Sequence, residues 1–155
     1  MKFGTAGNRL WATYYGGTGA GDWAFYVAAD AADNVYLTGQ TNSAAGIASG
    51  GFQNTYGAGF ADVFLVKFDA AGNRLWATYY GDAGNEEGLG ITTDAANNVY
   101  LAGITNSTAG IASGGFQNTI GGGFDAFLVK FDNAGNRLWA TYYGETGTDY
   151  GYGVA

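Results

Sequence analysis

The sequence AGNRLWATYYG occupies residues 71–81, and the same eleven residues stand at 6–16 and at 134–144. The sequence between these copies repeats as well, since GIASGGFQNT at 46–55 returns 64 residues later at 110–119. The chain of 155 residues therefore holds about two and a half copies of a unit of about 64 residues. Repetition at a fixed period is typical of repeat architectures, so both fold and function follow from one unit.

Each unit contains four runs with the length and composition of β-strands. The runs are rich in Val, Phe, Tyr, Trp and Leu and are bounded by Gly, Asn and Asp, and no helix of useful length is predicted. Short polar turns such as Asp30–Asn34 and Asp69–Asn73 join the runs in pairs, so each unit is expected to form two hairpins. The predicted strands are Trp23–Ala29, Val35–Thr41, Val63–Phe68 and Arg74–Tyr80, then Gly88–Thr93, Val99–Thr105, Ala126–Phe131 and Arg137–Tyr143.

Both faces of the predicted strands are apolar. In the third strand, Phe64, Val66 and Phe68 point to one side, while Val63 and Leu65 point to the other. An antiparallel sheet with one face in water would alternate apolar with polar residues, so each sheet is expected to be sandwiched between copies of itself. Radial stacking of four-stranded sheets is a β-propeller. A β-solenoid is the main alternative, but it usually repeats at shorter periods with one strand set per coil.

We therefore predict an all-β fold made of β-propeller blades, each a four-stranded antiparallel sheet. Residues 1–155 form a single repeat domain with complete blades at 22–81 and 86–144. Residues 1–16 supply a partial outer strand and residues 150–155 a partial inner strand. A long loop from Asn42 to about Ala61 links the two hairpins of a blade.

Composition and charge exclude several classes of function. The net charge of −7, with six Lys and Arg in all, argues against a nucleic acid or an anionic membrane as partner. No apolar run approaches the roughly 20 residues that span a bilayer, and the N-terminus lacks the apolar segment of a signal peptide. The chain has no histidine and no cysteine, which excludes Ser-His-Asp and Cys-His catalysis and removes the usual zinc ligands. No cofactor and no metal are predicted.

Three short motifs are better explained by structure than by chemistry. The glycine-rich Gly16–Gly21 lacks the Gly-Lys-Ser/Thr and the helix of a phosphate loop, so an interblade loop is predicted. The turns Asp30–Asn34 and Asp69–Asn73 lack the ligand order of a calcium loop, which favours turn capping. Glu86 and Glu87 could pair as the acid and base of a glycosidase, but the aligned Asp22 and Trp23 do not keep the pair, so a solvated loop charge is predicted.

Two groups of residues are candidates for sugar binding. Trp11, Trp76 and Trp139 could stack on sugar rings, but each lies in a strand with two apolar faces, which favours interblade core. The long loops should lie beside the interblade loops at one end of the propeller, and they carry amides that donate and accept hydrogen bonds as sugar hydroxyls require. The alternative is that these amides satisfy the loop backbone. The candidates are Asn42, Gln53, Asn54, Asn106, Gln117 and Asn118.

A family resemblance rests on these same repeats. The order GGFQNTYGAGFADVFLVKFDAAGNRLWATYYG at 50–81, then a Gly and acidic loop, then DAANNVYLAGITNS at 94–107, resembles the bacterial β-propeller repeat known as the SBBP repeat. The likeness covers nearly the whole chain. It implies a propeller blade of the kind often found in large secreted or cell-surface proteins, and hence an extracellular or cell-surface location. It implies no reaction and supplies no catalytic residues.

Two blades cannot close a ring, which predicts association of the chain with itself. Because one end of the pair resembles the interior surface at the other end, contacts should be head to tail, with three chains giving six blades and four giving eight. The N-terminal outer strand of one chain would then compete with Arg137–Tyr143 of its neighbour. The expected function is a non-enzymatic structural or interaction scaffold. A multivalent carbohydrate-binding propeller is the alternative, and a hydrolase using Glu86 comes third.

Overall fold

A computed structural model describes residues 1–19 and 21–155, and these residues contain β-strands and no helix. Ala20, inside the predicted Gly16–Gly21 loop, lies outside the described residues. The strands are β1 (Lys2–Phe3), β2 (Arg9–Trp11), β3 (Asp22–Ala29), β4 (Val35–Thr41), β5 (Asp62–Phe68), β6 (Arg74–Tyr80), β7 (Glu86–Thr93), β8 (Val99–Thr105), β9 (Asp125–Phe131) and β10 (Arg137–Tyr143).

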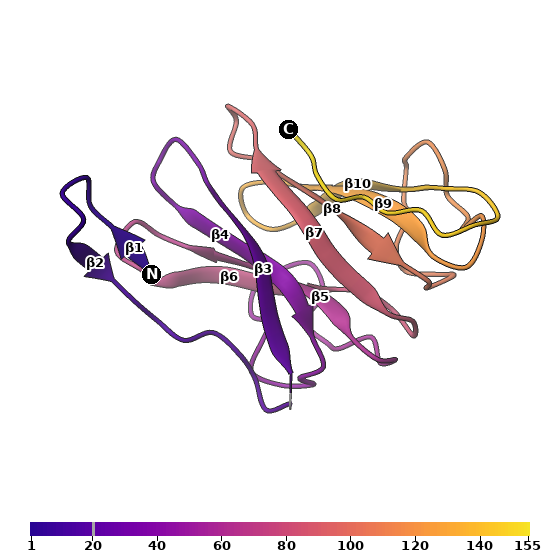
Figure 1. Ribbon diagram of the computed structural model, residues 1–155, viewed down its shortest axis with the longest axis horizontal. Helices are drawn as coiled ribbons and strands as arrows, with labels where there is room; N and C mark the ends of the chain where they lie inside the picture. Colours follow the sequence, from indigo (N-terminus) through magenta and orange to yellow (C-terminus); the bar gives the residue numbers. More distant parts are fainter. Residues whose placement is uncertain (20) are drawn as a thin grey trace.

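The strands form two antiparallel four-stranded sheets, in the orders β3-β4-β5-β6 and β7-β8-β9-β10. We call them the first and second blades. They lie side by side, with β7 packed across β3, β4 and β5, and they do not close into a ring (Figure 1). The predicted all-β class with four-stranded antiparallel sheets is confirmed. Strands β3, β5, β7 and β9 begin one or two residues earlier than the predicted runs.

The two ends of the chain form less strand than a blade would. Residues 2–11 make a short hairpin of β1 and β2, and the chain then continues without strand to Gly16, although the sequence of β6 is repeated there. The reason is that β1 offers only two residues as a pairing partner. The predicted inner strand at 150–155 is likewise irregular, and the preceding Thr148 makes a single parallel bridge with Phe124. A lone segment has no strand of its own blade to pair with.

All four hairpin turns within the blades share one hydrogen-bond pattern that the sequence encodes. In the second turn, Asp69 Oδ1 accepts from the backbone N–H groups of Ala71 and Asn73 at 2.9 and 2.8 Å, and Asp69 Oδ2 accepts from Asn73 Nδ2 at 2.9 Å. These bonds confirm turn capping. The fourth residue of every turn has a positive φ, which Gly, Asn and Asp tolerate best. These residues are Asp33 (65°), Gly72 (89°), Asn97 (60°) and Gly135 (86°).

The predicted two-sided burial of β5 is also confirmed. Val63 and Leu65 lie in a core cluster between the two blades. Phe64, Val66 and Phe68 lie in a second cluster on the opposite face of the first blade. The first blade is therefore covered on both sides, on one side by the second blade and on the other by the segment that follows β2.

The long loop of each blade runs along the outer strand. Ser49 and Ala77 exchange two backbone hydrogen bonds of 2.9 Å, and the N–H of Tyr79 donates to Gln53 O at 2.9 Å. The second blade repeats this arrangement between its loop and β10. The loop thus pairs with the free edge of the sheet, an edge that would otherwise be open to pairing with other chains. At its end the loop meets the interblade loop, where the N–H of Phe60 donates to Gly84 O at 3.2 Å.

Candidate functional site

The contact between the blades, which we call the seam, is built around Tyr80 and Trp76 of β6. The ring of Tyr80 lies 5.3 Å from that of Phe127 and 5.8 Å from that of Phe131, measured between centroids. Its hydroxyl donates to Ile111 O at 2.6 Å. Burial raises the pKa of Tyr80 well above its usual value, so this hydroxyl stays protonated as a donor. Trp76 Nε1 donates to Asn133 O at 3.1 Å.

A loop residue, Phe52, completes the seam. The centroid of the Phe52 ring is 6.4 Å from that of Phe131. The guanidinium of Arg137, from the second blade, lies 4.4 Å from the centroid of the Phe52 ring. A cation over an aromatic face is attracted by the negative charge of that face. Phe52 therefore ties the long loop of the first blade to the outer half of the second blade.

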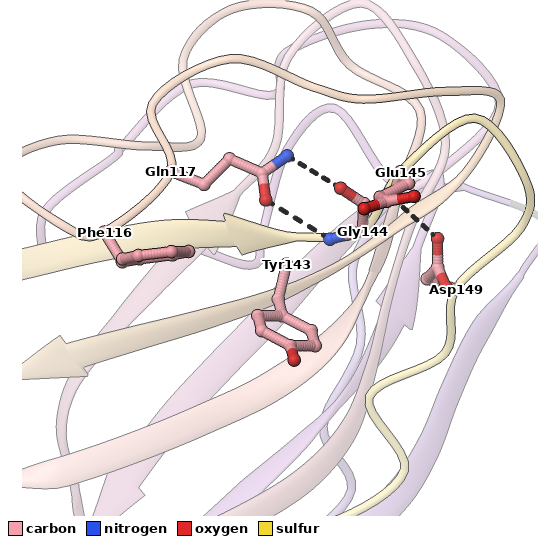
Figure 2. Close-up of a pocket in the computed structure, with 6 residues that line it drawn as sticks. All are labelled: Phe116, Gln117, Tyr143, Gly144, Glu145 and Asp149. Carbon is pink, nitrogen blue, oxygen red and sulfur yellow. Dashed lines mark hydrogen bonds between the residues drawn. The ribbon is translucent and has the colours of Figure 1, made fainter.

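The second blade presents the same residues with nothing against them. Tyr143, the repeat of Tyr80, is 70% exposed where Tyr80 is 0% exposed, and Phe116, the repeat of Phe52, is 88% exposed. These two side chains, with Gln117, Gly144, Glu145 and Asp149, line an open hollow of about 460 Å³ (Figure 2). We call the surface formed by Phe116, Trp139 and Tyr143 the open face. It is the seam without its second half.

Two buried carboxyl groups meet at one end of the seam. Asp62 Oδ2 accepts from the N–H of Gly57 at 2.7 Å, while Asp62 Oδ1 is buried without a hydrogen-bond partner. Glu86 Oε1 accepts from the hydroxyl of Thr105 at 2.7 Å. A Cβ on Gly81 would lie 2.5 Å from Glu86 Oε2 and 2.8 Å from Asp62 Oδ1, so a residue without a side chain is required between the carboxyl groups.

These surroundings disfavour charge on both groups. Burial, helped by the negative charges of Glu86 and Asp82, raises the pKa of Asp62 to about 7. Burial also raises the pKa of Glu86 above its usual value, although its hydrogen bonds to Thr105 and Ser107 oppose the shift. The seam therefore contains an acid that changes its charge near neutral pH.

The side-chain amides of the two predicted glutamines make hydrogen bonds within the protein. Gln53 Nε2 donates to Thr55 O at 3.0 Å and to Asp62 Oδ2 at 3.3 Å, and Gln53 Oε1 accepts from the N–H of Gly81. Gln117 makes the equivalent bonds and one more, to Gly144 O (Figure 2). An amide group has two donor hydrogens and one acceptor oxygen, so little of either side chain is left to bind a ligand.

The four predicted asparagines also bond to loop backbone. Asn42 Oδ1 accepts from the N–H of Gly21 at 3.0 Å, and Asn106 Oδ1 accepts from the N–H of Asn85 at 2.7 Å. Asn54 and Asn118 are exposed, and each donates one bond of 3.1 Å to a loop carbonyl. The structure thus distributes the six amides over two loops, and sugar binding stays a prediction.

The remaining candidates fall into structural positions. Glu86 was expected to be a solvated loop charge, and this expectation is wrong because the side chain is completely buried beside Asp62. Trp76 is 5% exposed and lies in the seam, as predicted, whereas Trp139 is half-buried on the open face and is not interblade core in the single chain. Within residues 1–19 and 21–155, no group of three or more acidic side chains is placed to hold a metal ion, and no helix is long and apolar enough to cross a membrane.

Sequence reasoning missed Phe52 and Phe116 as contact residues. Both lie in the loop sequence GGFQNT, whose Gln and Asn side chains indicate polar chemistry. The available signal was a large apolar residue kept in both copies of an otherwise polar loop. In the first blade this residue, Phe52, contacts Phe131 and Arg137 of the second blade.

These observations define a class, an all-β protein whose sheets are arranged as propeller blades, and comparison with known proteins agrees. Residues 10–45 match the family model described as a β-propeller repeat, SBBP. An uncharacterised WD repeat-containing protein of Acanthamoeba polyphaga mimivirus is 28% identical to the chain. That alignment covers all of this chain and 13% of the viral protein. The chain thus spans about an eighth of its relative, and both likenesses indicate a propeller scaffold.

Proposed function

We propose that the chain is a non-enzymatic propeller module that associates head to tail with copies of itself and serves as a structural or interaction scaffold. In this assembly the open face of one copy packs against the first blade of the next. An extracellular or cell-surface location, implied by the family resemblance, is part of the proposal.

The observation that carries the proposal is that Tyr143 is 70% exposed while its repeat Tyr80 is buried, and that Phe116 is 88% exposed while its repeat Phe52 is 40% exposed. The sequence around Tyr143 is identical to that around Tyr80 over eleven residues. The partner residues of the seam, Phe127 and Phe131, also have counterparts in Phe64 and Phe68 of the first blade. One end of the molecule therefore carries one half of the seam, and the other end carries the second half, which is the requirement for a heterologous contact.

Light scattering coupled to size exclusion at several concentrations tests this proposal. We expect a discrete trimer or tetramer, because three two-blade chains would give six blades and four would give eight. A ring should reach a fixed mass, whereas a contact that does not close should give a mass that keeps rising with concentration. A folded monomer at all concentrations would contradict the proposal.

A multivalent carbohydrate-binding propeller is the second candidate. The exposed amides of Asn54 and Asn118, one in each long loop, would provide repeated weak sites whose avidity increases in an assembly. A glycan array signal that is lost in the variant N54A/N118A, with unchanged solution mass, would favour this function. The same assembly without any glycan signal would favour the scaffold alone.

A further inference from the structure

We infer that residues 9–15, which we call the N-terminal segment, occupy the surface that a second copy needs and must leave it before the copies can join. This inference rests on the proposed head-to-tail association. The surface lies on the side of the first blade away from the seam and consists of Ile47, Phe64, Phe68 and Ala70. We call it the first-blade face.

The N-terminal segment makes the same contacts with the first-blade face that β6 makes across the seam. Tyr15 donates to Ile47 O at 2.9 Å, as Tyr80 donates to Ile111 O at 2.6 Å. The ring of Tyr15 lies 5.4 Å from that of Phe64 and 5.9 Å from that of Phe68.

The tryptophans of the two contacts correspond as well. Trp11 Nε1 donates to Ala70 O at 3.0 Å, and Trp76 Nε1 donates to Asn133 O at 3.1 Å, at the same position of the next turn. A glycine with positive φ faces the indole in both places, Gly72 beside Trp11 and Gly135 beside Trp76. The first-blade face thus binds the sequence RLWATYY.

The second copy would bring the same sequence to the same surface. Residues 9–15 read RLWATYY, and so do residues 137–143 of the open face. The contacts made by these seven residues are therefore equal in the two states and cancel when one segment replaces the other. The preference for one segment over the other therefore depends on contacts made by residues outside these seven.

A second copy covers more of the first blade than the N-terminal segment does. Beyond that segment, Val27 of β3 is 64% exposed. A hollow of about 280 Å³, lined mainly by apolar side chains that include Val27, Leu37 and Tyr15, remains between the segment and the inner half of the blade. A whole blade would also bring its own Phe116, which the N-terminal segment lacks. The intramolecular contact is thus favoured by proximity and the intermolecular one by buried apolar area.

The test compares two matched double variants of the full chain by sedimentation equilibrium over a range of concentrations. W11A/Y15A weakens the N-terminal segment on the first-blade face, and W139A/Y143A makes the same change in the identical sequence of the open face. We expect W11A/Y15A to associate at about tenfold lower concentration than the unaltered chain, because the competing contact is lost. We expect W139A/Y143A to remain monomeric.

Each outcome separates the inference from the proposed function. If the unaltered chain associates and W11A/Y15A associates no more readily, residues 9–15 do not compete and the inference is overturned while the scaffold stands. If no form associates, both are overturned. If W11A/Y15A does not fold, Y15F replaces it, since this change removes only the bond to Ile47 O. Unchanged association of Y15F would also overturn the inference.

Oxidative footprinting of side chains supplies a direct readout. Trp11 and Tyr15 should become more reactive as the concentration rises through the association range, while Trp139 and Tyr143 become less reactive. Protection of both pairs of side chains in the assembled state would show that the N-terminal segment stays in place, and would overturn the inference.

Discussion

At the scale of single residues, the repeats place one side chain in two environments and so provide internal controls. Tyr80 and Tyr143 have the same eleven-residue surroundings in sequence, yet Tyr80 is buried and Tyr143 is 70% exposed. A difference in stability between matched variants of the two residues therefore measures the contribution of the seam, because the contribution of the strand is the same in both. The same comparison applies to Trp76 and Trp139.

We expect Y80F to lower the free energy of unfolding by about 0.5–1.5 kcal/mol, because it removes the buried hydrogen bond to Ile111 O, a carbonyl that keeps a second donor in Arg137 Nη1 at 3.0 Å. Y143F, the matched control, should change it by less than about 0.5 kcal/mol in the monomer. Urea unfolding of both variants at a concentration where the chain is monomeric measures the difference. Equal effects would mean that the hydroxyl of Tyr80 contributes nothing specific to the seam.

The turn aspartates give a second pair. Asp30 accepts hydrogen bonds from its own turn and from the hydroxyl of Tyr36, and its carboxylate lies 3.8 Å from the buried Lys67 Nζ. D30N leaves this buried lysine without its counter-charge and should destabilise the chain by about 3 kcal/mol. D69N, in an exposed turn, should destabilise the chain less than D30N does. Thermal unfolding of the two variants tests this order, and the reverse order would exclude a role for the ion pair.

At the scale of elements, the seam joins β5, β6 and β7 through the carboxyl pair of Asp62 and Glu86. The raised pKa of Asp62, about 7, means that the folded state binds more protons than the unfolded state between the usual pKa of an aspartate and pH 7. The stability from this group is complete at acidic pH and is lost as the pH rises through about 7. The turn aspartate Asp69 has the opposite sign, since hydrogen bonds from Asn73 lower its pKa.

We expect the free energy of unfolding to fall by about 1–2 kcal/mol between pH 5 and pH 8. D62N should remove most of this decrease, because an amide can accept from the N–H of Gly57 and carries no charge at any pH. E145Q, in an exposed loop, is the control and should keep the full decrease. Unfolding curves at both pH values measure the slope, and an unchanged slope in D62N would assign the titration to another group.

The strands and their faces could be predicted well from the sequence, but the conformation of the repeated sequence near the N-terminus could not. The alternation of Val63 and Phe64 fixes which residues face each cluster, because the period of a strand is two. Residues 9–15 have the sequence of an outer strand but lack a third strand to pair with, so tertiary context overrides their strand propensity. Gln53 was open to a binding or a backbone role, and only its partners in space show that its amide is used by Thr55, Asp62 and Gly81.

At the scale of the whole molecule, charge opposes assembly. Each copy carries a net charge of −7, and copies must approach closely to share a seam. Like charges are screened over about 30 Å at 0.01 M salt but over about 8 Å at 0.15 M. The apolar seam is little affected by the same change, so the balance between repulsion and contact depends on salt.

We therefore expect self-association to strengthen as the salt concentration rises from 0.01 M to 0.15 M, by about tenfold in the concentration at half-association. Sedimentation equilibrium at the two salt concentrations measures it. W139A/Y143A is the control and should stay monomeric in both. Weaker association at higher salt would indicate that attraction between charges, and not the apolar seam, holds the copies together.

Because Arg9–Tyr15 precede both blades in the chain, the initial ratio of monomers to assemblies should depend on how the protein was folded. A ribosome releases residues 9–15 before it has made Phe64 and Phe68, so the tethered segment is already present when its receptor forms. A neighbouring chain arrives later and only by diffusion. Material folded during synthesis should thus begin as closed monomers, while material refolded from denaturant at high concentration should begin as a mixture, even though both share the same final equilibrium.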